Sequence, residues 1–465
     1  MAVERAPYIN YNELTSNPLL TGEGSEIPIF VGTSGNTVES VSRKNIYVCK
    51  NIQEVKDAIG TSGPLYSNIE KFYRENNARL LTGQTALSVP YIYVFDLGSN
   101  NKIDDYKKAL KESKVKRDAT CIAIIGSAAS SSNDLKWESF SETTGSGNEQ
   151  TTVTKYELIN IDEVEFSPLY VETLDSAVKT VITKALSGIK LTESEKTQFE
   201  TAFTANQTNL LITFANGINN ELKEETKQGL LRIAYMGLDK QTGSETFEQY
   251  VSRISDITTA VGSTRIGFVE LNEASDIGLT VARICSTPYY IEPGYDGYLS
   301  VETTQYEYFA ERTPEERDAL FNAGLIFNEY DYTLPEITPR ICLAVSSAWG
   351  ITEIANADKR VNDALIHARR NVDHQIRELF KVIAPQLKRN ETSVNLLQLN
   401  TELNICLESE VDAGRIQEYE IDVEEVTMNP YCLKISGRIV PVNSTLAIEF
   451  ENYVGAPYAI ATDYI

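Results

Sequence analysis

The chain has 465 residues, room for about three domains, and its 42 % apolar and 9 % aromatic content excludes a disordered chain. Sixty-six acidic residues against 42 basic ones give a net charge of −24, which argues against nucleic acid as a partner. The sequence has no run of about 18 apolar residues and no apolar secretory signal at its start. We therefore expect a protein made in a cytoplasm, with no direct membrane insertion.

The first hundred residues predict an extended arm followed by alternating strands and helices. Residues 1–22 show no sustained period of 2 or 3.6, which indicates an arm. The apolar run at 27–32 predicts a buried strand. Capping residues then predict helices at 51–60 and 65–76, which lead to a strand at 91–95. This β-α-α-β order is typical of an α/β layer.

The middle of the chain, residues 101–300, continues with helices and strands. Its apolar runs predict strands at 121–125, 231–236 and 266–269. The stretch from 127 to 152 is rich in Ser, Thr, Gly and Asn, which indicates a surface loop or hairpin. We interpret this segment as the decoration of an inserted domain.

The last third predicts helices first and strands afterwards. Thr313, Pro314 and Glu316 have the spacing of a helix start, and Gly324 ends that helix. The elements expected after it are a strand at 341–345, a long helix at 353–384, a helix at 394–411, and strands at 419–423, 431–440 and 445–451. In the last of these strands Leu446, Ile448 and Phe450 alternate with other residues, which predicts a strand with one buried face.

The sequence contains few residues in patterns typical of a catalytic or cofactor-binding site. Its two histidines, His367 and His374, lie seven residues apart on one predicted helix, and we interpret both as solvated. No phosphate-binding loop is present, and the six scattered cysteines lack the spacing of a zinc site, so we interpret them as buried thiols. We predict no catalytic residue, no cofactor and no metal, and hence that the chain is not an enzyme.

The long predicted helix has two distinct faces. At 100° per residue one narrow sector collects the apolar residues Val361, Leu365, Ala368, Val372, Ile376, Leu379 and Ile383, which we expect to be the core face. The opposite side collects four cations, Lys359, Arg370, Arg377 and Lys381. This basic stripe is either an ordinary solvated face with intrahelical pairs or a ridge that docks on an acidic partner.

In their order, these segments resemble a contractile tail sheath protein. The resemblance lies in the N-terminal arm, the run Ile29-Phe30-Val31-Gly32, the helices at 51–60 and 65–76, and the helix at 314–324. It extends to the helices near 358–384 and 394–411 and to the β-rich end, and it covers about half of the chain.

This resemblance implies an α/β (mixed α+β) multi-domain subunit. Its core domain would be discontinuous, at 23–100 and 301–444, with an outward-facing inserted middle domain at 101–300 and terminal arms at 1–22 and 445–465. Such a subunit polymerises helically around an inner tube and contracts to drive the tube through a target envelope. Its partners would be copies of itself, in hexameric rings, the inner tail tube, and the baseplate and tail terminator proteins.

The same resemblance assigns roles to two groups of residues. Lys359, Arg370, Arg377 and Lys381 become candidates for tube contact, and Leu446, Ile448 and Phe450 become candidates for a strand shared between subunits. The protein would lie in a virion tail or contractile particle that is assembled in the cytoplasm of a bacterial host. Two alternatives remain open: an α/β enzyme with a divalent metal held by carboxylates, and another self-assembling shell or surface protein.

Overall fold

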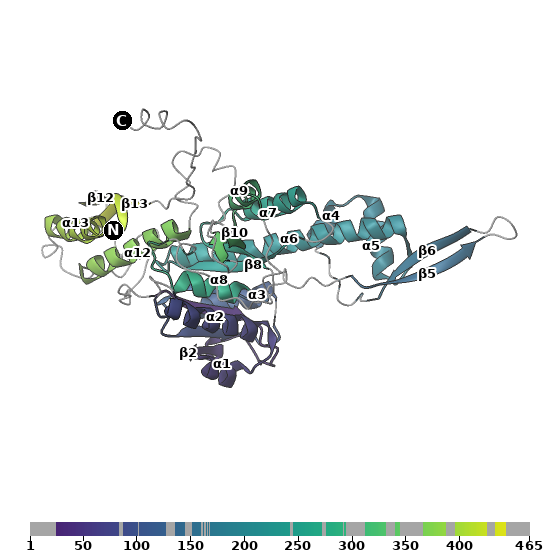
Figure 1. The fold of residues 1–465 in the computed structure, drawn as a ribbon, viewed down its shortest axis with the longest axis horizontal. Helices are drawn as coiled ribbons and strands as arrows, with labels where there is room; N and C mark the ends of the chain where they lie inside the picture. Colours follow the sequence, from purple (N-terminus) through teal and green to yellow (C-terminus); the bar gives the residue numbers. More distant parts are fainter. Residues whose placement is uncertain are drawn as a thin grey trace, which may run out of the picture.

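A computed structural model gives the fold (Figure 1). It describes residues 25–442 except for 83–86, 101, 127–134, 145–150, 160, 162–163, 165, 167, 242–244, 272–275, 292, 294–311, 332–339, 345–365, 387–395 and 426–432. Both predicted terminal arms, 1–22 and 445–465, lie outside the described residues. The mixed α/β class that the sequence predicts is confirmed.

A sheet of eight strands forms the centre of the molecule, in the order β11-β10-β9-β8-β4-β1-β3-β2. The strands are β1 (Ile27–Gly32), β2 (Ile46–Cys49), β3 (Ile92–Asp96), β4 (Ala119–Ile124), β8 (Ile233–Asp239), β9 (Ile266–Leu271), β10 (Leu325–Asp331) and β11 (Arg340–Ala344). The six inner strands are parallel, and the edge strands β2 and β11 pair antiparallel with their neighbours. The inner strands are short apolar runs because both faces of a parallel sheet are covered.

Helices cover both faces of this sheet. On one face lie α3 (Ile103–Ser113), α6 (Glu193–Thr226), α7 (Phe247–Val261) and α9 (Pro314–Asn322), which pack on alternate strand residues such as Val31, Ile124 and Phe268. On the other face lie α1 (Ile52–Ile59), α2 (Gly63–Thr82) and α8 (Asp276–Cys285), which pack on residues such as Phe30 and Val94. The alternation of strand side chains between the two clusters follows from the period of two in a strand.

Local chemistry sets the ends and the packing of these helices. The Asn51 side chain accepts a hydrogen bond from the Glu54 amide, and Gly60 ends α1 with a φ of +80°. Thr313 and Glu316 cap α9 reciprocally. A Cβ on Gly278 of α8 would lie 1.8 Å from the Asn68 carbonyl oxygen of α2, so only glycine allows these two helices to approach so closely.

A small lobe projects from the central sheet (Figure 1). It contains the hairpin β5 (Trp137–Thr144) and β6 (Thr151–Leu158), the short strand β7 (Leu191–Thr192), α4 (Pro168–Thr173), α5 (Ser176–Leu186) and the first half of α6. The lobe has its own core, in which the Trp137 and Phe199 rings lie edge to face at 5.6 Å. Of the two structures expected near 127–152, a loop or a hairpin, the described residues show the paired strands of a hairpin.

The structure corrects the expected domain boundaries. Residues 101–300 do not form a separate inserted domain, because β4, β8 and β9 are parallel neighbours of β1 and β10 in the same sheet. Only the lobe around 135–205 stands apart. Whether it faces outward in an assembly stays a prediction.

The last described elements lie at the end of the molecule opposite the lobe (Figure 1). They are α12 (Ile366–Ile383), the 3-10 turn η5 (Ala384–Gln386), α13 (Leu396–Asp412), β12 (Ile416–Glu425) and β13 (Leu433–Pro441). Strands β12 and β13 pair antiparallel and form a separate sheet. Of the helices that the structure describes, none combines the length and the apolar content that a membrane crossing requires.

Candidate assembly interface

Helix α12 packs against the amino ends of the parallel strands through polar contacts. Arg370 donates from Nε to Glu26, just before β1, at 3.0 Å, and from its terminal nitrogen to the Thr287 carbonyl at 2.7 Å. Asp373 pairs with Arg265, just before β9, and with Arg369 on its own helix. These contacts fix α12 across the edge of the sheet.

The same helix also binds the elements that follow it. Gln375 donates to Glu410 of α13 at 2.8 Å, and Asn371 donates to the Arg415 carbonyl, just before β12, at 2.6 Å. The His374 ring stacks on Tyr289 at 3.7 Å between ring centres. α12 is thus a polar joint between the central sheet and the C-terminal pair of strands.

Burial keeps both histidines neutral in this joint. Desolvation, with nearby arginines, lowers the pKa of His367 to about 4 and that of His374 to about 3. The expectation that both are solvated is therefore wrong. His367 is 1 % exposed and His374 is 8 % exposed.

The predicted faces of the long helix also need correction. Arg370 is only 1 % exposed, so the basic stripe does not point outward at this position. Three buried residues of α12 are apolar, namely Ile366, Ala368 and Phe380, but most of its buried side is polar: His367, Arg370, Asn371, Asp373, His374 and Gln375. Of the expected core face, Ala368 is buried, whereas Val372, Ile376 and Leu379 are only half-buried. The physical reason is that the end of a sheet presents backbone carbonyls and charged residues, which need polar partners.

The other tube-contact candidates differ from Arg370. Arg377 is largely buried and donates to the Leu231 carbonyl at 3.4 Å, while Lys381 pairs with Glu378 on its own helix. Lys359 lies outside the described residues. A tube contact by any of the four stays a prediction, and the geometry leaves Lys381 the least engaged of the three that are described.

The pair β12–β13 is a two-stranded sheet with open edges. In the described part of the chain no third strand pairs with either edge. Tyr419 and Val423 on β12 lie opposite Ile439 and Ile435 on β13, and these four side chains are half-buried on the side of α13. The other face is exposed and carries four carboxylates of β12, two of which, Glu418 and Glu424, pair with Arg438 and Lys434 of β13. The pair packs on α13, and its edges carry main-chain N–H and C=O groups that no described strand pairs with, as the edges of a sheet do.

The candidate strand residues Leu446, Ile448 and Phe450 lie outside the described residues. Sequence reasoning found β12 and β13 as strands but did not identify them as a separate open sheet. The alternation of acidic and apolar residues in β12 indicated a strand with one exposed face. A strand inside a parallel sheet would instead be apolar on both faces.

At the edge of the sheet where α/β proteins usually bind ligands, two of the described donors bind backbone oxygens of the chain itself. That edge is the carboxyl end of the strands, next to the point where strand order reverses, here between β1 and β4. The first turn of α2 donates its Leu65 amide to the Thr33 carbonyl at 3.3 Å. The Tyr106 hydroxyl donates to the Ile125 and Gly126 carbonyls at 2.6 and 2.8 Å. Of the described groups at this edge, the Leu65 amide and the Tyr106 hydroxyl are thus engaged with backbone oxygens.

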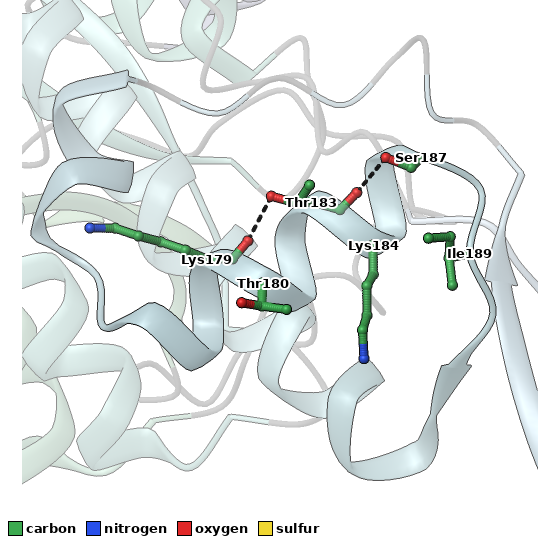
Figure 2. Close-up of a pocket in the computed structure, with 6 residues that line it drawn as sticks. All are labelled: Lys179, Thr180, Thr183, Lys184, Ser187 and Ile189. Atoms are coloured by element: carbon green, nitrogen blue, oxygen red, sulfur yellow. Dashed lines mark hydrogen bonds between the residues drawn. The ribbon is translucent and has the colours of Figure 1, made fainter.

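A shallow groove of about 270 Å³ on the projecting lobe offers no converging groups either. Figure 2 shows its two lysine side chains extending in different directions. Lys184 binds Glu195 at 2.7 Å, and Lys179 donates to the Glu172 carbonyl at 3.1 Å. Among the residues that the structure describes, no group of three or more His, Cys, Asp or Glu side chains is placed to hold a metal ion. Of the six cysteines, Cys49, Cys121 and Cys285 are buried as expected, and Cys406 is half-buried.

Comparisons with known proteins show the fold. No protein-family model matches the chain, and no curated protein is similar to it. One similar solved structure is the 6-fold symmetrised baseplate of the anti-feeding prophage, with a TM-score of 0.53 and 10 % identity over 98 % of this chain and 100 % of that chain. Another is the contracted helical sheath of the same particle, with a TM-score of 0.51 and the same identity and coverage. The chain therefore has the fold of chains found in the baseplate and in the contracted sheath of that particle.

Proposed function

We propose that this chain is a structural subunit of a contractile tail sheath. In this role it polymerises in helical rows around an inner tube and contracts to drive the tube through a target envelope. One observation carries the proposal: the fold of a contracted helical sheath chain matches over 98 % of this chain and the whole of the other. A match over the full length includes the central sheet, the projecting lobe and the C-terminal elements.

The open pair β12–β13 supports this proposal by offering a place where subunits can join. Its two edges expose main-chain donors and acceptors, which an extended segment of a neighbour can pair with. The segments 1–22 and 445–465 of adjacent copies are the proposed donors, and the second contains Leu446, Ile448 and Phe450. Twenty extended residues reach about 65 Å, which is enough to cross onto a neighbour.

Contraction then requires subunits that move as rigid bodies while their shared strands stay paired. The hydrogen bonds to the Thr33 and Gly126 carbonyls fit a structural role, because they join α2 and α3 to the ends of the strands. The proposed partners are further copies in hexameric rings, the inner tube, the baseplate and the terminator. The proposed location is a virion tail or contractile particle, assembled in the cytoplasm of a bacterial host.

Electron microscopy of the purified full-length chain tests this proposal. We expect hollow tubes of uniform width, and we expect a variant lacking residues 1–22 to remain monomeric with an unchanged thermal transition. A truncated chain that still forms ordered tubes would refute the linking role of the arm. Particles with no helical order from the full chain would refute the sheath role itself.

A second candidate is a fixed component of the baseplate, because the baseplate structure matches this fold at least as well as the sheath. The same images separate the two roles. A baseplate component closes into rings of defined size and stops, whereas a sheath subunit continues to add rings along an axis.

A further inference from the structure

Charge is distributed unevenly in this chain. The whole protein carries −24, and residues 396–425 alone, which form α13 and β12, contain nine carboxylates and a single arginine. On the exposed face of β12 lie Glu420 and Asp422, and Asp412 is exposed at the end of α13. We call α13 and β12 together the acidic lobe. Like charges repel, so contacts between copies of such a protein are favoured where opposite charges meet.

An oppositely charged surface lies on the central body. It is formed by the 3-10 turn η1 (Arg43–Asn45) and by α3 with the turn that follows, and it carries Arg43, Lys44, Lys108, Lys111, Lys114 and Arg117. Arg43 contacts Glu112 at 2.9 Å, which joins the turn η1 to α3 in one surface. We call this surface the basic face.

Several cations of the basic face are available for a partner. Lys44, Lys108 and Arg117 are exposed and form no ion pair with any residue that the structure describes. Arg43 and Lys111 have partners, at Glu112 and Glu221, but 65 % and 60 % of their side chains remain exposed. The surface thus keeps a positive charge in a strongly negative protein.

We propose that the basic face of one subunit binds the acidic lobe of a second copy. The two surfaces belong to different parts of the molecule, since the acidic lobe lies at one end and α3 lies on the central body (Figure 1). Contact between two different surfaces is a head-to-tail contact, which continues from copy to copy and generates rings or helical rows. This inference rests on the proposed helical assembly and adds a charge-dependent contact to the shared strands.

The second copy is the occupant that the charges favour. Nucleic acid also binds basic surfaces, but the net charge of −24 would repel a phosphate backbone approaching the rest of the molecule. The acidic lobe is present in every copy at the same concentration as the basic face, so each subunit brings its own complement.

Charge reversal on each surface, alone and together, tests the contact. The first variant carries Lys44→Glu, Lys108→Glu and Arg117→Glu, and the second carries Asp412→Lys, Glu420→Lys and Asp422→Lys. At about 50 mM salt we expect each triple variant to raise the critical concentration for assembly at least about tenfold. The variant with all six changes again has complementary surfaces, and we expect it to return to within about threefold of the wild type.

The matched control is Lys179→Glu, Lys184→Glu and Lys190→Glu, which makes the same charge change on the projecting lobe. We expect it to assemble as the wild type does, and we expect the first two variants to approach the wild type at about 500 mM salt. The two test variants and their combination should keep the thermal midpoint of the wild type within about 2 °C, because their six changed side chains are exposed. The control lysines are half-buried, and Lys184 pairs with Glu195, so the midpoint of the control is measured separately and its assembly is compared below that temperature.

The outcomes separate this inference from the proposed function. Suppose that the wild type polymerises but the variant with all six changes does not recover, or that the control is as impaired as the triple variants. In either case the charge contact is wrong and the sheath role stands. Normal assembly of both triple variants also overturns the contact. The contact is also overturned if the basic face binds duplex DNA and does not bind a second copy of the chain. A wild type that stays monomeric at every salt concentration overturns both proposals.

Discussion

Replacing Arg370 with Met removes the guanidinium that joins α12 to the central sheet. In the folded chain this group is 1 % exposed and binds the Glu26 carboxylate at 3.0 Å and the Thr287 carbonyl at 2.7 Å. Removing one member of a buried pair costs about 3–5 kcal/mol, because the other charge stays buried without its partner. The Glu26 side chain keeps 12 % exposure and has Arg377 at 4.0 Å, so we expect a loss of about 3 kcal/mol.

Urea unfolding, followed by circular dichroism, measures this loss. The control is Lys227→Met just after α6, whose exposed side chain pairs with Glu224 three residues earlier, and we expect no measurable change in the urea midpoint. Combining Arg370→Met with Glu26→Gln should cost less than the sum of the single changes, by about 2 kcal/mol. Strictly additive costs, or equal midpoints for Arg370→Met and the control, would show that the pair is not buried as described.

Three further changes test other parts of the fold. Gly437→Ala places a Cβ 2.5 Å from the Glu420 carbonyl oxygen in the β12–β13 pair, so we expect tube formation in electron micrographs to be lost while the main thermal transition remains. Glu225→Gln leaves Arg232, fully buried and bound to it at 2.5 Å, without its countercharge, and we expect a loss of about 3–5 kcal/mol in urea unfolding. His374 has a pKa of about 3 when folded and about 6.5 when unfolded, so its stabilising effect is complete above pH 6.5 and decreases as the pH falls. We expect the step from pH 7 to about pH 5 to cost about 2 kcal/mol, and His374→Phe, which keeps a ring in the stack, to remove that part of the acid sensitivity.

Local elements could be predicted from the sequence because their signals are local. The cap of α1 at Asn51 and the reciprocal cap of α9 at Thr313 and Glu316 appear in the structure as expected. The strands predicted at 27–32 and 266–269 are confirmed as β1 and β9. The prediction worked because four to eight apolar residues between turn signals are typical of a strand buried on both faces.

The order of the strands could not be predicted, because it depends on contacts between distant segments. β1 pairs with β4 across about ninety residues and β4 pairs with β8 across more than a hundred, and nothing in either run specifies its neighbour. The boundaries placed at 100 and 300 therefore cut through one sheet. Chain length alone cannot reveal that strands before and after the inserted lobe, such as β4 and β8, belong to one sheet.

The predicted apolar and basic faces of α12 were wrong for a different reason. An amphipathic pattern predicts which face is apolar, but not whether that face meets a core or the polar end of a sheet. His374, Asn371 and Gln375 gave a usable signal, since uncharged polar residues on a helix face dominated by charges often satisfy buried partners.

The long helix α6 has a mechanical consequence. Its 34 residues form one continuous helix, about 51 Å long at 1.5 Å per residue. Phe199 near its beginning belongs to the core of the projecting lobe, whereas Phe214 and Leu222 near its end pack on the central sheet. The lobe therefore cannot rotate relative to the central sheet unless α6 bends. A gold particle or fluorophore attached beside the β5–β6 hairpin would therefore record the tilt of the whole subunit.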